Sequence, residues 1–334
     1  MKIQNFTAVL AACIVAFGLC GRAIADPLPG EVLKFQQLPL NNGLAPSVGG
    51  APYPGHDEWS TARIGLTPGN YTGTFMADDF ADLSNDPVVH VRWWGSYDQN
   101  FTAANGVQNF LISFESDVPA GPAPSFSHPG QPLLNQIVSK GVLAPGSGTF
   151  TEKIINGNVN EHLYEYNAEL KVPFAEQANT VYWLKIVALN NPAPVTSGGD
   201  GGIYNWGWHD RDWGIKDNLA SVPPLVSPGE GDIGPLILPN GTPTPVYHFQ
   251  DDAVSGFVSI SPNAAGFPTV QQTGYNPENY IHIPGAVPID GPPGIEKFSK
   301  DLAFELYFRQ VPEPSTLALL TVGALGLGAM VWRR

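Results

Sequence analysis

Residues 164–170 read Tyr-Glu-Tyr-Asn-Ala-Glu-Leu, so every second side chain is apolar and most of those between are polar. An alternation with a period of two places the two sets of side chains on opposite faces of a β-strand. The same period recurs along the chain at residues 89–93, 110–114 and 302–308. Residues 181–188 (VYWLKIVA) are almost continuously apolar, as expected of a strand in the middle of a sheet. These segments predict a protein built from strands.

The turns between these segments indicate the fold class. Clusters of Gly, Pro, Asn and Asp separate the predicted strands, and only residues 131–140 have a pattern that allows a short helix. Many short strands with such turns are typical of β-sandwiches. We therefore expect an all-β protein, a jelly-roll-like β-sandwich with long Pro/Gly-rich loops at 219–250 and 261–296. One sandwich with long insertions is favoured over a sandwich with a second small unit.

The chain is acidic and has only two cysteines. Its 334 residues include 16 Lys and Arg against 30 Asp and Glu, which gives a net charge of −14. This balance excludes nucleic acid as an expected partner, because few cations are available to neutralise phosphates. Both cysteines, Cys13 and Cys20, lie near the N-terminus in a segment with the features of a leader. The mature chain is thus expected to hold no disulfide and no Cys-ligated metal, and to be stabilised by core burial.

The N-terminus has the three parts of a secretory signal peptide. A basic start at Met1-Lys2 precedes an apolar run over residues 8–19, and Ala23-Ile24-Ala25 follows. Small residues at Ala23 and Ala25 mark the expected cleavage site. A lipoprotein signal at Cys20 is disfavoured because it needs a small residue just before the cysteine, whereas Leu19 stands there.

The C-terminus carries the most specific motif. Pro312-Glu313-Pro314 precedes an apolar run over residues 317–332 and the terminal pair Arg333-Arg334. The run is at the short limit for a transmembrane helix, and the two arginines would keep its end in the cytoplasm. Two prolines end a helix and keep the preceding segment extended, which suits a protease substrate.

These three parts, in this order, resemble the PEP-CTERM sorting signal of exopolysaccharide-producing Gram-negative bacteria. The resemblance implies that Pro312, Glu313 and Pro314 are recognised by an exosortase, a membrane transpeptidase-like protease. It also implies that the C-terminal helix anchors the protein in the inner membrane only until it is processed. The expected location is then the cell surface or the extracellular matrix.

Short motifs in the ectodomain add a second resemblance. They are Ala-Asp-Asp-Phe at 77–80, Val-Arg-Trp-Trp-Gly-Ser-Tyr at 91–97, Trp-Gly-Trp at 206–208, Asp-Asp-Ala-Val at 251–254 and Leu-Ala-Phe at 302–304. Together they resemble a group of exported β-sandwich proteins that often end in the same sorting signal and have no activity that can be transferred. The expected boundaries are a signal peptide at 1–25, an extended Pro/Gly-rich arm at 26–69, the sandwich at 70–310 and the sorting signal at 311–334.

The strongest candidate for a binding surface is the segment Tyr204–Trp213. In a strand, Trp206, Trp208, Asp210 and Asp212 would point the same way. With Trp213, they could form a glycan-binding patch, in which indoles stack on sugar rings and carboxylates accept hydrogen bonds from hydroxyl groups. The favoured interpretation, however, is that the tryptophans pack in the core, at least one of Trp206 and Trp208 among them, because strand packing needs large side chains inside. Asp210 and Asp212 could also be the two carboxylates of a glycosidase, a pattern that many acid pairs in this chain would match.

No cofactor is expected, although Asp78, Asp79 and Asp82 could supply oxygen ligands to calcium, with Asp251 and Asp252 added from a distance. The favoured interpretation is that these are solvated loop carboxylates. The overall prediction is a non-enzymatic surface or matrix protein with a structural or adhesive role in the exopolysaccharide layer. Its expected partners are the exosortase, the inner membrane before processing, and exopolysaccharide. A lectin-like glycan-binding module or a carbohydrate-active enzyme is the alternative.

Overall fold

The computed structural model describes residues 27–310 except 41–54, 66–68, 99–105, 156–161, 194–195, 197–198, 218, 220–230 and 283–289. The predicted cleavage residues Ala23 and Ala25, the sorting residues Pro312, Glu313 and Pro314, and the apolar run at 317–332 lie outside this range. Within the described part of the chain, no helix is long and apolar enough to cross a membrane.

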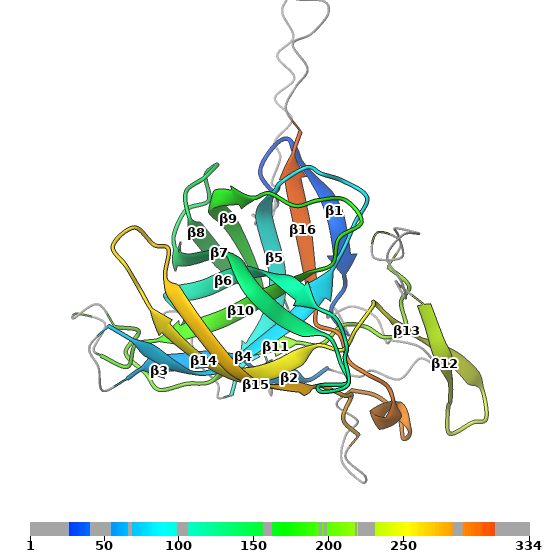
Figure 1. The fold of residues 1–334 in the computed structure, drawn as a ribbon. Helices are drawn as coiled ribbons and strands as arrows, with labels where there is room; N and C mark the ends of the chain where they lie inside the picture. Colours follow the sequence, from blue (N-terminus) through cyan, green and yellow to red (C-terminus); the bar gives the residue numbers. More distant parts are fainter. Residues whose placement is uncertain are drawn as a thin grey trace, which may run out of the picture.

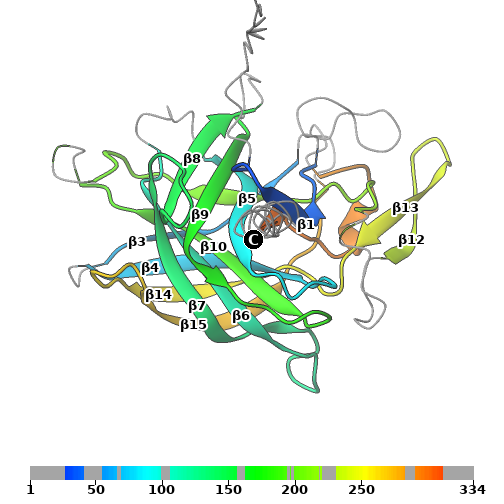
Figure 2. The same cartoon turned by 90° about the horizontal axis from the view of Figure 1, so that it is seen from above.

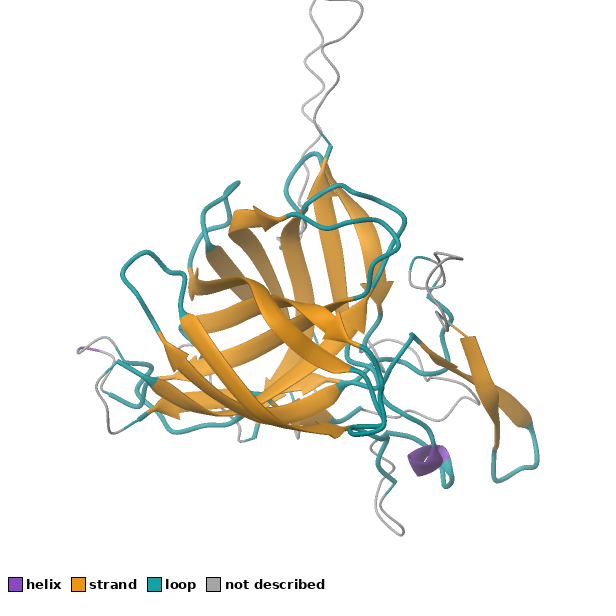
Figure 3. Ribbon diagram, viewed as in Figure 1, coloured by secondary structure: helices purple, strands orange, loops and turns teal. Residues whose placement is uncertain are grey.

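The regular structure of the described residues is almost entirely β-strand, joined by turns and long loops (Figure 3). The strands and the 3-10 turn η3 are β1 (Glu31–Gln37), β2 (Asp57–Trp59), β3 (Thr61–Ile64), β4 (Tyr71–Phe80), β5 (Val88–Tyr97), β6 (Asn109–Val118), β7 (His128–Lys140), β8 (Thr149–Ile154), β9 (Tyr164–Phe174), β10 (Tyr182–Asn190), β11 (Trp206–His209), β12 (Gly231–Ile237), β13 (Pro243–His248), β14 (Val254–Ser261), β15 (Thr269–Pro277), η3 (Ile295–Lys297) and β16 (Phe304–Arg309).

One large sheet dominates the molecule. Its strands follow the order β1-β16-β5-β9-β8-β7-β6-β10-β3-β4-β14-β15, and β11 bridges β5 and β2. Strand β2 continues through Ser60 into β3, which pairs with β10. Because β11 pairs with both β2 and β5, the strands from β5 to β10 are linked back to β5 and form a closed circuit. The sheet bends over itself, so that its halves face each other as in a sandwich (Figures 1 and 2). The prediction of an all-β, sandwich-like fold is confirmed.

The strand β10 explains why one segment of the sequence is apolar at nearly every position. All nine of its residues are buried. Leu184 and Ile186 belong to the large core inside the closed circuit, whereas Trp183 and Val187 belong to a second core on the opposite face. A strand covered on both faces has no position at which a solvated side chain is needed.

The large core is rich in aromatic rings. Trp93 of β5 stacks on Tyr166 of β9 with their centroids 5.3 Å apart. Phe114 of β6 stacks on Phe174 of β9 at 4.4 Å. Rings of this size bury 150–250 Å² each as a rule, so a few contacts across the circuit provide much of the burial that stabilises the sheet.

Three parts of the chain differ from their predicted structure. The segment expected as an extended arm contributes β1, β2 and β3 to the main sheet, and β1 pairs with the last strand. Residues 131–140, where a short helix was allowed, belong to the long strand β7. The predicted long loops contain β12, β13 and β15, and part of them packs in a small third core around Trp213, Tyr280 and Phe298.

Candidate functional site

The tryptophans of the predicted glycan patch are interior residues. Trp206, Trp208 and Trp213 are each 0% exposed. Their indole N–H groups donate to the Tyr166 hydroxyl at 3.1 Å, the Ala303 carbonyl at 2.8 Å and the Asp290 carbonyl at 2.8 Å, respectively. With both faces covered and each donor satisfied, these indoles offer no surface on which a sugar could stack. They are core residues, which is the interpretation that the sequence favoured.

The carboxylates of the same segment are also enclosed. Asp210 is fully buried and accepts a hydrogen bond from the backbone N–H of His56 at 2.7 Å. Burial, together with the charge of Asp290, raises its pKa well above the usual range. Asp212 accepts from the N–H of Gly214 at 2.8 Å, and burial raises its pKa to about 6. The two carboxylates of a glycosidase must flank a substrate. These two side chains instead accept hydrogen bonds from the backbone N–H groups of His56 and Gly214.

Next to Asp210, β11 lies in a network of buried charges. His209 Nδ1 lies 2.9 Å from Asp57 Oδ1, and His209 Nε2 lies 3.0 Å from the Leu40 carbonyl oxygen. Burial opposes the charged imidazolium, but Asp57 outweighs it and raises the pKa of His209 to about 9. Because both ring nitrogens face acceptors, the ring is held doubly protonated.

The three predicted calcium ligands do not share a site. Asp78 and Asp79 are consecutive in β4 and therefore point to opposite faces of the sheet. Asp78 Oδ2 accepts a hydrogen bond from the Leu302 N–H at 2.6 Å. Asp82 lies 3.4 Å from the Lys34 ammonium. The predicted trio is therefore corrected: its members belong to three separate environments.

A second cluster of acidic residues, Glu31 and Glu169, is neutralised by two neighbouring cationic side chains. Ligand atoms of Glu31, His90 and Glu169 all lie within 4.8 Å of one another. Burial would raise the pKa of Glu31, but hydrogen bonds to His90 and Glu169 lower it to about 2. Arg309 Nη2 lies 3.0 Å from both carboxylate oxygens of Glu169 and also contacts Glu31. Two cations balance the two glutamates, so the cluster is complete as an ion-pair network.

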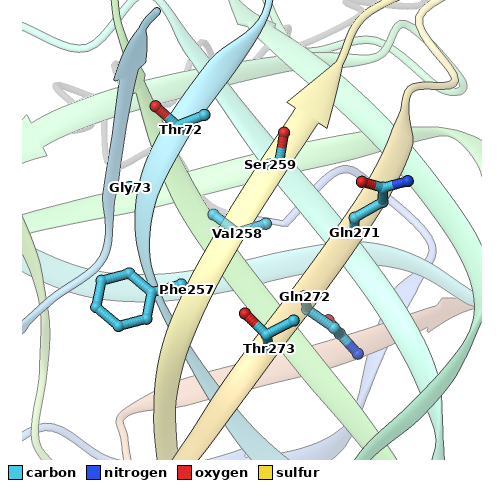
Figure 4. Close-up of a pocket in the computed structure, with 8 residues that line it drawn as sticks. All are labelled: Thr72, Gly73, Phe257, Val258, Ser259, Gln271, Gln272 and Thr273. Atoms are coloured by element: carbon cyan, nitrogen blue, oxygen red, sulfur yellow. The ribbon is translucent and has the colours of Figure 1, made fainter.

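The exposed face of β4, β14 and β15 carries a shallow groove of about 340 Å³. Figure 4 shows its lining, in which the Phe257 ring stands beside hydroxyl and amide groups. The lining residues are Thr72, Gly73, Phe257, Val258, Ser259, Gln271, Gln272 and Thr273. None of these eight has a charged side chain, and Phe257 is 64% exposed. Phe257 is thus an exposed aromatic ring surrounded by uncharged polar side chains.

A further polar residue, Thr74, lies next to the groove and connects it to a second exposed aromatic residue. Phe257 lies opposite Thr74 on β4 and opposite Thr273 on β15. The Thr74 hydroxyl donates to the Trp59 carbonyl at 3.2 Å, and Trp59 is 46% exposed. Thr74 thus lies opposite the exposed Phe257 and is hydrogen-bonded to the backbone of Trp59, a second exposed aromatic residue.

Two glycines hold this face together. A Cβ on Gly73 would lie 2.1 Å from the Thr61 carbonyl oxygen, so only glycine lets β3 and β4 approach this closely. A Cβ on Gly256 would lie 2.6 Å from the Phe75 ring. With Gly256 seated over Phe75, the next residue, Phe257, faces outward.

Sequence reasoning missed this groove, although a signal was present. In Val254–Ser261 the buried positions are Val254, Gly256, Val258 and Ile260. Phe257 is therefore in phase with the serines on the polar face. An aromatic residue that shares its phase with serines would have identified the exposed ring.

Comparison with known proteins supplies the family. A family model described as a domain of unknown function (DUF7901) matches residues 33–249, more than half of the chain. The PEP-CTERM protein-sorting motif matches residues 310–334. No curated protein and no solved structure matches the chain. The protein therefore belongs to the DUF7901 family and ends in a PEP-CTERM signal, which indicates that it is exported and sorted by an exosortase.

Proposed function

We propose that this exosortase-sorted protein has a structural or adhesive role in the exopolysaccharide layer, and that it holds polysaccharide in the groove between β4, β14 and β15. The observation that carries the proposal is the exposed Phe257 ring among uncharged hydroxyl and amide side chains. The ring can cover the apolar C–H face of a sugar, while Ser259, Gln271 and Thr273 are within the same groove to hydrogen-bond its hydroxyl groups.

The strength of such a contact suits adhesion. Covering roughly 60 Å² of ring at about 25 cal/mol per Å² contributes about 1.5 kcal/mol, which alone gives a weak complex. A polysaccharide repeats the same sugar many times, and many copies of the protein on one surface would bind it together with far higher avidity. A layer protein needs this kind of multiple, weak attachment.

The chemistry of the lining favours binding over bond cleavage and a neutral polymer over an anionic one. The eight lining side chains include no carboxylate, imidazole or thiol that could act as acid, base or nucleophile. They also include no Lys or Arg for acidic sugars, and the chain as a whole carries a net charge of −14. We therefore expect neutral sugar segments to be preferred.

The placement of the groove agrees with attachment at the C-terminus. Strand β16 pairs with β1, and the N–H of Gln310, two positions before Pro312, donates to the Gly30 carbonyl at 2.9 Å. Figure 1 shows the end of β16 at the top of the domain, whereas β14 and β15 run across its lower part, with the turn of the hairpin at the left. A protein held by its C-terminus would present this hairpin away from the attachment point.

The test is retention of the mature protein in native gels that contain exopolysaccharide isolated from the producing strain. We expect retardation of the wild type, and loss of most of it in Phe257→Ala. Ile203→Ala is the matched control, because Ile203 is 66% exposed and lies outside the groove. Equal retardation of wild type and Phe257→Ala, or no retardation of the wild type, would contradict the proposal.

A further inference from the structure

Lys34 is a buried lysine at an irregular point in the pairing of β1 with β16. Its neighbours Leu33 and Phe35 face consecutive residues of β16, so Lys34 itself is the additional residue of a β-bulge. Lys34 and Phe35 are both buried, which breaks the alternation of an ordinary strand. A bulge turns a side chain in a new direction. This one places an ammonium group in the interior of the protein.

Two carboxyl groups from other segments meet the side chain of Lys34. Glu176, in the connection between β9 and β10, contacts Lys34 Nζ directly through its Oε1 atom. Asp82, in the connection between β4 and β5, has its Oδ2 atom 3.4 Å from the same nitrogen. The side chains of Lys34, Glu176 and Asp82 are 2%, 3% and 6% exposed. An amine and two carboxyl groups thus share one enclosed place.

Hydrogen bonds hold the two connections that carry these acids against each other. The Asn179 N–H donates to the Asp82 carbonyl oxygen at 2.8 Å, and the Ala178 N–H donates to Asn85 Oδ1 at 2.9 Å. The Ser84 N–H donates to Asp82 Oδ1 at 2.7 Å, so the other oxygen of this carboxyl group is the one that faces the lysine. The fold itself therefore keeps the three groups in contact.

The charges of this group favour a neutral carboxylic acid. One ammonium cannot balance two buried carboxylates. Burial and the charge of Asp82 outweigh the opposing effect of Lys34 and raise the pKa of Glu176 to about 8, so Glu176 is mainly protonated at neutral pH. A carboxylic acid is more open to attack by an amine than a carboxylate is, because it carries no negative charge. Holding the two in contact also makes their reaction effectively unimolecular.

We propose that the side chains of Lys34 and Glu176 become joined by an amide bond after folding, with Asp82 as the acid–base group. Asp82 takes one proton from the Lys34 ammonium, and the free amine attacks Glu176 Cδ. The bond between Cδ and the hydroxyl oxygen then breaks, and the hydroxyl leaves as water with a second proton from the nitrogen. The products are a secondary amide, one water molecule and a protonated Asp82, which returns its proton to solvent. The reaction needs no oxidant.

This bond gives the protein a covalent cross-link that needs no cysteine. The chain has no cysteine after Cys20. The cross-link joins positions 142 residues apart and fixes β1, which lies at one end of the main sheet. A cross-link stabilises chiefly by restricting the unfolded chain, and more so for a long loop. The site is separate from the Phe257 groove, so its test is independent of polysaccharide binding.

Mass spectrometry of the mature protein from the producing strain tests the bond without any substitution. Trypsin cannot cleave after a lysine whose amine has become an amide. We therefore expect the denatured protein to yield a branched peptide, in which residues 172–185 are attached to the peptide that ends at Arg63. Its mass should be one water molecule below the sum of the two. Complete cleavage after Lys34 would overturn the proposal, as would a branch that carries residues 64–92, which contain Asp82.

Three variants test the roles of the residues. Asp82→Asn should lose the branched peptide, because an amide cannot take the proton from the lysine, and full cross-linking of this variant would overturn the role of Asp82. Asp86→Asn is the matched control and should keep the bond, because its side chain is exposed and bonds to Ser84 in the same connection. Lys34→Arg keeps the positive charge without the reactive amine, and should melt about 10 °C or more below the wild type. Where a variant fails to fold, the digest of the wild type still decides.

Discussion

The β11 segment and the β14 segment use aromatic residues in opposite ways. The Trp-Gly-Trp motif at 206–208 has two of the largest side chains in the protein, and both are fully buried. Strand β14 has a single ring, Phe257, and leaves it largely in solvent. The comparison teaches that a high density of aromatic residues indicates core, whereas an isolated ring in the polar phase of a strand indicates a surface for contact.

The largest effect should come from the buried side of this comparison. Each Trp→Ala change at Trp206 or Trp208 should lower the free energy of unfolding by about 3–5 kcal/mol, through lost burial and the cavity left behind. The double variant should fail to fold, because total stabilities are about 5–15 kcal/mol. Phe257→Ala should instead change stability by less than about 0.5 kcal/mol. Urea unfolding compares all three, and a well-folded double variant would show that β11 does not anchor the core.

The second prediction concerns a buried ion pair that lies beneath the exposed groove. Lys185 Nζ lies 2.5 Å from Glu115 Oε1, both are fully buried, and the groove residue Gln272 donates to Glu115 Oε2 at 2.6 Å. Lys185→Met should cost about 3–5 kcal/mol, because Glu115 is left as an unpaired buried charge.

Adding Glu115→Leu should recover much of that loss, since neither charge then remains. The measurement is urea unfolding of the single and double variants at one pH. A double variant no more stable than Lys185→Met would show that the pair contributes through its specific geometry and not through charge balance.

A smaller effect is expected from the buried charge on β11. His209 has a pKa raised to about 9 by Asp57, so its native state keeps a proton that the unfolded chain loses near pH 6.5. The stabilisation is complete below pH 6.5 and is lost as the pH rises toward 9. It amounts to at most about 3 kcal/mol.

Unfolding free energies of the wild type and His209→Gln between pH 6 and pH 9.5 provide the measurement. The difference between the two proteins should shrink as the pH rises. A constant difference would mean that His209 is neutral in the folded state.

Local patterns predicted much of the fold, because strand period and strand burial are local properties. Residues 164–170 and 182–188 form strands as expected. Strand β1 could not be identified in this way, because its pairing partner Arg309 lies 278 positions from Glu31. Residues 131–140 were misjudged because their apolar positions fit a helix, while pairing with β6 holds them extended.

The candidate sites were less predictable. Asp78 and Asp79 looked like joint ligands, although consecutive residues in a strand face opposite ways and cannot meet. The exposure of Phe257 could have been predicted from its position in the strand, because it alternates with Val258 and Ile260, which lie on the buried face.

The pairing of β1 with β16 also sets the order of events during export. Strand β16 lies between β1 and β5, so neither early strand has its full set of neighbours until residue 309 has crossed the membrane. Contacts this far apart in the chain form late. The sorting motif begins at the next residue, 310. The sheet can therefore be completed only when the signal for the exosortase has also arrived, and a truncated chain would lack both.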